Sequence, residues 1–119
     1  MKNNYKILIA DDSAFMRQVL IDCLKVEGYN NFVECENGLQ CIEKFESEKP
    51  DLVLLDLIMP EMDGIEVLKK IGSKAKIIVI SAIGQNKMID DAKKYGAKGF
   101  IIKPFDQAKI NEEINKILN

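Results

Sequence analysis

Short, uninterrupted apolar runs alternate along this chain with segments of helical periodicity. The runs cover residues 7–10, 52–55, 77–80 and, more briefly, 100–102. Continuous apolar runs of this length are typical of strands that are buried on both faces, as in a parallel sheet. Residues 32–36 alternate between apolar and polar side chains instead, which predicts an edge strand with one solvated face.

The intervals between these runs carry apolar stripes at helical spacing. The first stripe runs from Phe15 to Leu24, with Asp12 or Ser13 as the N-cap and Gly28 as the stop. Five strand–helix units in 119 residues leave about 24 residues for each, which predicts an α/β fold with an open, doubly wound parallel sheet. We expect a single domain over residues 1–119, with no output domain after the last helix. The later stripes are Leu39, Ile42 and Phe45; Ile65, Leu68 and Ile71; Met88, Ile89 and Ala92; and Ile110, Ile114, Ile117 and Leu118.

Composition excludes several classes of protein. The net charge of −2 argues against nucleic acid as the main partner. The chain has no histidine, which excludes the common zinc motifs and a Ser-His-Asp triad. Its three cysteines lack CxxC spacing, no apolar run approaches the length of a membrane span, and the start lacks the apolar stretch of a signal peptide. We therefore expect a reduced, cytoplasmic protein with no membrane partner.

Polar residues follow the predicted strands at the edge where function collects in open parallel sheets. Asp11 and Asp12 follow the first strand, Asp56 the third, Ser81 the fourth and Lys103 the fifth. Each has an ordinary structural explanation: a helix cap, a polar strand end, a turn residue or a solvated lysine. Their joint placement at four strand ends favours a functional site.

Three clustered carboxylates repel one another. At about 5 Å and an effective dielectric constant near 20, each pair costs roughly 3 kcal/mol. A divalent cation would remove this repulsion, and oxygen ligands without histidine favour Mg²⁺ or Mn²⁺ over Zn²⁺. Such a cation can also take a phosphoryl oxygen as a ligand, so the cluster suits phosphoryl transfer with Asp56 as the nucleophile.

The chain resembles, over its whole length, the response regulator receiver domain of two-component signalling. The similarity is carried by residues 9–13 (IADDS), 55–60 (LDLIMP) with 62–64 (MDG), 81–82 (SA) and 103–105 (KPF). Within the family, the segments DDSAFMR and SAIGQ are similar to single-domain chemotaxis regulators of the non-enteric kind. The resemblance implies a flavodoxin-like sheet of five parallel strands in the order 2-1-3-4-5, with five helices.

The resemblance also implies roles for particular residues. Lys103 would reach across roughly 10 Å, two strand spacings, to the phosphoryl group. The Lys103–Pro104 peptide bond would be cis, and Gly64 would free the backbone of the loop that follows Pro60. The implied Mg²⁺ ligands are Asp12, Asp56 and the backbone carbonyl of Ile58, with Asp11 acting through water.

The implied function is a phosphorylation-activated switch. A histidine kinase, here a chemotaxis kinase, would phosphorylate Asp56, and the receiver would catalyse its own phosphorylation and dephosphorylation without being counted as an enzyme. The hydroxyl of Ser81 would turn inward, and Phe100, which also suits a core aromatic, would move into the vacated space. We expect a monomer that binds the flagellar motor switch protein and is served by a phosphatase. Candidate output residues are Met88, Lys94, Lys98 and Lys109, although the lysines equally suit a solvated surface.

Two isoleucines depart from the enteric chemotaxis pattern, which has polar residues at both positions. Ile58 lies two residues after Asp56, and Ile83 two residues after Ser81. They either pack the rim of the site or hinder the water that attacks the aspartyl phosphate. If they hinder water, Ile58→Asn combined with Ile83→Glu should speed autodephosphorylation.

Of three other functions, the sequence leaves one open and argues against two. The chain could be a stand-alone phosphorelay intermediate that passes its phosphoryl group to a histidine phosphotransfer protein. An aspartyl-phosphate phosphohydrolase would need a DxD motif after the first strand, whereas Asp11 and Asp12 are adjacent. A flavin carrier would need a Ser/Thr/Gly-rich phosphate loop there, and two aspartates would repel a phosphate.

Overall fold

The computed structural model describes residues 4–82 and 84–118, in which strands and helices alternate strictly along the chain. Each predicted strand is present with bounds that differ by no more than two residues, and the alternating segment predicted at 32–36 is a strand over 31–35. No helix in the described part of the chain is long and apolar enough to cross a bilayer. In order, the elements are β1 (Lys6–Ala10), α1 (Ala14–Val26), β2 (Asn31–Cys35), α2 (Gly38–Glu48), β3 (Leu52–Asp56), α3 (Gly64–Ile71), β4 (Ile77–Ala82), α4 (Asn86–Lys94), β5 (Gly99–Lys103) and α5 (Gln107–Leu118).

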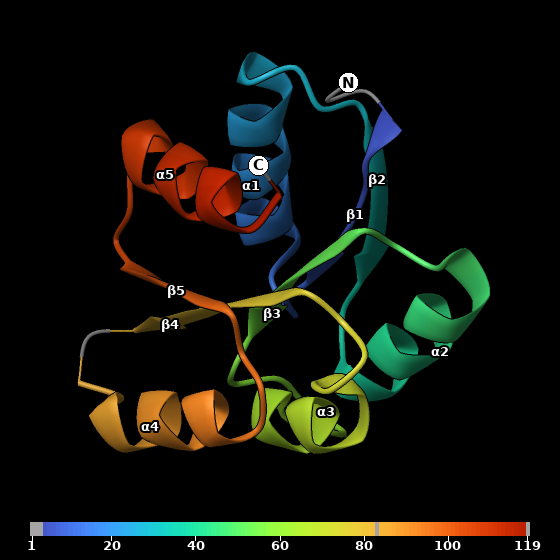
Figure 1. The fold of residues 1–119 in the computed structure, drawn as a ribbon, viewed down its shortest axis with the longest axis vertical. Coiled ribbons are helices and arrows are strands. Elements are labelled where there is room, and N and C mark those ends of the chain that lie inside the picture. The colour runs from blue at the N-terminus through green and yellow to red at the C-terminus, as the bar shows by residue number, and fades with distance from the viewer. Residues whose placement is uncertain (1–3, 83, 119) are drawn as a thin grey trace.

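The strands form one parallel sheet in the order β2-β1-β3-β4-β5, which confirms the predicted topology. Helices α1 and α5 cover one face, and α2, α3 and α4 cover the other (Figure 1). Each face buries its own apolar cluster, and the central strands contribute side chains to both. The central strands are therefore continuously apolar because both of their faces are covered.

The two edge strands differ in how well the apolar pattern describes them. β2 lies at one edge, as its alternating sequence predicts. β5 lies at the other edge, and Ile102 near its carboxyl end is 42% exposed. The prediction that residues 100–102 are buried on both faces is therefore wrong at Ile102, because an edge strand has a neighbouring strand on one side only.

The apolar stripes also fail to predict burial in the first turns of two helices. Phe15 in α1 is 77% exposed and Leu39 in α2 is 48% exposed, whereas the residues of α1 that pack on the sheet are Leu20, Ile21 and Leu24. Each of these helices starts at the carboxyl edge of the sheet, where its first turn extends past the strands. The N-cap of α1 is Ser13, whose hydroxyl accepts from the N–H of Met16 at 3.2 Å, so Asp12 is free of that role.

Candidate functional site

Three carboxylates from two neighbouring strands meet at the carboxyl edge of the sheet. Asp11 and Asp12 follow β1 directly, and Asp56 is the last residue of β3. Ala10 lies opposite Leu55, and one carboxylate oxygen of each aspartate lies within 4.8 Å of the others. The structure therefore brings the predicted acidic residues together, with Asp11 and Asp56 buried and Asp12 exposed.

Asp11 is hydrogen-bonded to residues at the start of α1, but one of its carboxylate oxygens accepts no hydrogen bond from a described residue. Its Oδ1 accepts from the N–H of Ser13 at 2.9 Å, and its carbonyl accepts from Nη1 of Arg17 at 2.6 Å. Its Oδ2 is buried and accepts no hydrogen bond from any described residue, although the ammonium of Lys103 lies 3.6 Å away. A buried carboxylate oxygen in this state, beside two further carboxylates, fits a site that holds a cation.

The ammonium group of Lys103 reaches this cluster from the far side of β4. Its Nζ lies 3.5 Å from Oδ2 of Asp56 and 3.6 Å from Oδ2 of Asp11. β5 and β3 are separated by β4, so the contact depends on the length of the lysine side chain. The Lys103–Pro104 peptide bond is cis, as predicted.

The predicted switch residues lie on β4 and β5. Ser81 is buried, and no described residue forms a hydrogen bond with its Oγ. Since a hydroxyl can donate and accept, Ser81 has hydrogen-bonding capacity to offer a group bound at this edge. Phe100 lies opposite Val79, is half-buried against the core, and has Nζ of Lys93 at 5.4 Å from its ring centroid.

The electrostatics of the site leave negative charge uncompensated. Burial raises the pKa of the Asp56 carboxyl above its ordinary value, and the charge of Asp11 raises it further. The N–H of Ile58, 3.2 Å from Oδ1, and the ammonium of Lys103 lower this pKa without cancelling the rise. The candidate ligands are all oxygen atoms, so the residues present fit Mg²⁺ or Mn²⁺.

Replacing Asp56 with asparagine should stabilise the protein when divalent cations are absent. A raised pKa in the folded state means that folding disfavours the ionised carboxylate. At pH values above the ordinary pKa, the charge of Asp56 therefore lowers the free energy of unfolding. This loss becomes smaller as the pH falls and the carboxyl is protonated. We expect Asp56→Asn to raise the free energy of unfolding by about 1 kcal/mol at pH 7. Urea denaturation in EDTA measures this, with exposed Asp90→Asn in α4 as the control. A less stable Asp56→Asn protein would contradict the prediction.

The loop after β3 departs from expectation at Gly64. The φ angle of Gly64 is not positive, so the expected release of the backbone is not why glycine stands here. Instead, a Cβ at this position would lie 2.6 Å from Cα of Leu57 and 2.7 Å from the carbonyl oxygen of Asp56. Glycine is therefore required by the close approach of α3 to the end of β3.

Sequence patterns do not predict the contacts of some residues at the site. Arg17 donates to the carbonyl of Asp11, a role that its place in the segment DDSAFMR does not by itself reveal. The side chain of Ile58 is 53% exposed, while its backbone N–H contacts Asp56. The second departure from the enteric pattern, Ile83, lies outside the described residues.

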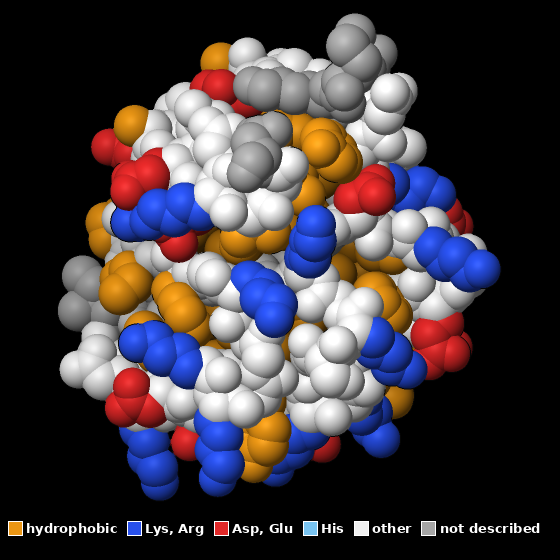
Figure 2. Space-filling model, in the orientation of Figure 1, with side chains coloured by type: hydrophobic (Ala, Val, Ile, Leu, Met, Phe, Trp, Pro, Cys, Tyr) orange, Lys and Arg blue, Asp and Glu red, His pale blue; other side chains and the backbone are white. Residues whose placement is uncertain are grey.

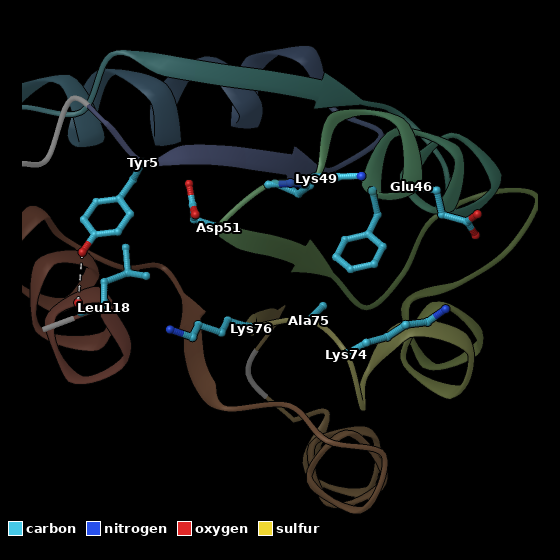
Figure 3. A pocket seen from close by; sticks show the side chains of 10 residues that line it. Tyr5, Glu46, Lys49, Asp51, Lys74, Ala75, Lys76 and Leu118 are labelled. Atoms are coloured by element: carbon cyan, nitrogen blue, oxygen red, sulfur yellow. Dashed lines mark hydrogen bonds between the residues drawn. The ribbon is translucent and has the colours of Figure 1, made fainter.

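A groove of about 580 Å³ lies at the opposite end of the sheet from the carboxylates. Asp51 and Lys76, which precede β3 and β4, line it together with Tyr5, whose hydroxyl donates to the carbonyl of Leu118 at 3.3 Å (Figure 3). The aspartate cluster does not contribute to its lining, so this groove and the candidate site are separate features of the structure.

Comparison with known proteins points to one family. The family model described as the response regulator receiver domain matches residues 7–115. The chain is 49% identical to the chemotaxis protein CheY of Bacillus subtilis, over 97% of this chain and 98% of that protein. It is also 42% identical to sporulation initiation phosphotransferase F of the same organism, over 97% and 94% of the two chains.

A solved structure agrees with this. The crystal structure of the CheX–CheY–BeF3–Mg²⁺ complex from Borrelia burgdorferi contains a chain that is 33% identical and superposes with a TM-score of 0.89. The match covers 97% of this chain and 90% of that one. The similarity therefore extends across all ten described elements of the fold and is not confined to the site.

Proposed function

Because this chain belongs to the response regulator receiver family, we propose that it is a phosphorylation-activated switch whose phosphoacceptor is Asp56. It is a receiver domain of a CheY-like response regulator in two-component signalling. In this proposal residues 1–119 form one receiver domain that acts as a cytoplasmic monomer. The observation that carries it is the convergence of three aspartates with Lys103, whose Nζ lies 3.5 Å from Asp56.

The proposed reaction is phosphoryl transfer from a histidine kinase. A carboxylate oxygen of Asp56 attacks the phosphorus of phosphohistidine, so that a P–O bond forms, the P–N bond breaks and the imidazole leaves with a proton. Lys103, whose Nζ lies 3.5 Å from Asp56, would neutralise charge on the phosphoryl group. Mg²⁺, held by Asp12, Asp56 and the carbonyl of Ile58 with Asp11 acting through water, would supply further positive charge there. Attack of water on phosphorus then regenerates Asp56 and releases phosphate.

Phosphorylation with and without metal tests this chemistry. The protein is incubated with acetyl phosphate in Mg²⁺ or in EDTA, and its mass and the modified residue are determined. We expect one phosphoryl group in Mg²⁺ and almost none in EDTA, because the uncompensated carboxylates repel the incoming anion. Equal phosphorylation in EDTA would show that the aspartate cluster is not a metal site used in the reaction.

The switch that follows involves Ser81 and Phe100. The hydroxyl of Ser81 has no partner among the described residues and would donate to a phosphoryl oxygen on Asp56. Phe100 would then repack toward the space that this movement opens. Phenylalanine lacks the hydroxyl of tyrosine, so its inward packing costs less desolvation.

We expect the output surface to comprise α4, β5 and α5. Figure 2 shows basic side chains gathered over the region of α3 and α4. Lys94, Lys98 and Lys109 are exposed, whereas Met88 is half-buried against the core and offers less surface than expected. The flagellar motor switch is the proposed partner, by similarity to the CheY relatives.

The alternative is a phosphorelay intermediate. It is favoured by the 42% identity to sporulation initiation phosphotransferase F. Two assays with the phosphorylated protein separate the functions: transfer of phosphate to a histidine phosphotransfer protein, and binding to a peptide of the motor switch protein. Transfer without binding would support the relay, and phosphorylation-dependent binding would support the chemotaxis function.

The exposed side chain of Ile58 leads to a prediction about phosphate lifetime. The backbone of Ile58 lies beside the phosphoacceptor, because its N–H donates to Asp56, and its apolar side chain is 53% exposed. We expect this side chain to hinder the approach of water. We expect Ile58→Asn to speed loss of the phosphoryl group by about tenfold, equivalent to a barrier lower by about 1.4 kcal/mol. Decay of the phosphoprotein after removal of acetyl phosphate measures this. Ile58→Val, which keeps the site apolar, is the control, and equal decay of the two variants would rule out the idea.

A further inference from the structure

A buried acidic residue lies on α5, away from the aspartate cluster. Glu113 is only 7% exposed and sits beside Ile110 and Ile114, which are the other buried residues of this helix. Buried carboxylates are uncommon unless they are paired and hydrogen-bonded. The proposed phosphorylation chemistry makes no use of Glu113, so its burial calls for another explanation.

One oxygen of Glu113 binds the backbone of the proposed switch residue. Its Oε1 accepts from the N–H of Phe100 at 3.2 Å. β5 is an edge strand, so alternate N–H groups have no neighbouring strand to bind, and the carboxylate takes that place. The contact depends on Gly99, where a Cβ would lie 3.2 Å from Oε1 and 3.1 Å from Cδ1 of Ile117.

The other oxygen of Glu113 faces two lysines on the surface of α5. Oε2 lies 2.9 Å from Nζ of Lys116 and 3.7 Å from Nζ of Lys109. The same carboxylate therefore joins the backbone of β5 at Phe100 to two exposed ammonium groups. The neighbouring Glu112 pairs with Lys116 at 3.5 Å but is exposed.

We infer that Glu113 is a positioning residue of the switch, which ties the backbone of Phe100 to the surface of α5 around Lys109 and Lys116. A displacement of Phe100 then moves this surface, and a partner bound to these lysines biases Phe100 in return. The inference rests on the proposed function, in which phosphorylation of Asp56 is sensed at Phe100.

Backbone amide NMR tests whether Glu113 couples Phe100 to α5. Spectra of the wild type, Glu113→Ala, Glu113→Gln and Glu112→Gln are recorded before and after addition of Mg²⁺ and beryllofluoride. In the wild type we expect shift changes at Ser81 and Phe100 and along residues 109–116. We expect Glu113→Ala to keep the changes at Ser81 but to lose those on α5. Glu112→Gln, which removes the other carboxylate paired with Lys116, should respond as the wild type does.

The conservative variant separates positioning from general destabilisation. The amide oxygen of Glu113→Gln can still accept the N–H of Phe100, so we expect it to restore part of the α5 response. Hydrogen exchange at the Phe100 amide should quicken by about tenfold or more in Glu113→Ala, the loss expected for a hydrogen bond to a charged acceptor. If Glu113→Ala does not fold, an α5 response in Glu113→Gln weaker than in Glu112→Gln supports the inference, and an equal response overturns it.

Other outcomes separate this inference from the proposed function. An α5 response that persists in folded Glu113→Ala overturns the inference, as does a wild type that responds at Ser81 but not along α5. A wild type that responds at neither Asp56 nor Ser81 overturns the proposed function, on which the inference depends.

Discussion

Asp56→Asn should abolish uptake of a phosphoryl group from acetyl phosphate in the presence of Mg²⁺. The amide oxygen of asparagine is a poor nucleophile. We expect neither neighbouring carboxylate to replace Asp56, because Oδ1 of Asp11 accepts from the N–H of Ser13 and Asp12 is exposed. We expect the rate of modification to fall by more than about a thousandfold. Intact-protein mass spectrometry over time measures this.

The matched control for this experiment is Asp90→Asn. Asp90 is an exposed aspartate on α4, so its replacement makes the same chemical change away from the sheet edge. It should be phosphorylated as fast as the wild type. Modification of Asp56→Asn at a rate near that of Asp90→Asn would show that another residue is the phosphoacceptor.

Gly64→Ala should destabilise the protein strongly. The added Cβ would lie 2.6 Å from Cα of Leu57 and 2.7 Å from the carbonyl oxygen of Asp56, and both contacts are with backbone that cannot rotate away. The N–H of Gly64 also donates to the carbonyl of Leu57 at 2.8 Å, which fixes the two segments together. We expect a loss of about 3 kcal/mol in the free energy of unfolding.

Urea denaturation of Gly64→Ala measures this loss as a lower midpoint with an unchanged slope. Gly84→Ala is the comparison, because Gly84 has a φ of 95° but, its chain neighbours aside, no atom of a described residue lies within 4 Å of its added Cβ. That variant carries backbone strain without a clash and should lose about 1 kcal/mol. A loss in Gly64→Ala no larger than in Gly84→Ala would mean that α3 moves freely away from β3.

The sequence was sufficient to predict the sheet and the position of its acidic residues. Apolar runs of strand length mark the central strands, since the residues of a strand covered on both faces are all apolar. A parallel sheet brings the carboxyl ends of its strands to one edge, so Asp11, Asp12 and Asp56 had to be near one another once the strand order was known.

Resemblance to the receiver family supplied that strand order, because periodicity alone does not say which strands are neighbours. It also supplied the reach of Lys103, which the structure places at 3.5 Å from Asp56. The reason inferred for Gly64 was wrong, since its requirement for glycine comes from a backbone contact between α3 and β3 and not from its own φ angle.

Tertiary structure alone decided which side chains of each helix are buried. Phe15 fits the apolar stripe of α1 but is 77% exposed, whereas Glu113 carries a carboxylate and yet is only 7% exposed. Helical periodicity describes one helix at a time, whereas burial depends on what lies opposite, here the end of the sheet beneath Phe15 and the free edge of β5 beside Glu113. Local pattern thus specified the elements, and contacts between distant segments specified the surroundings of each side chain.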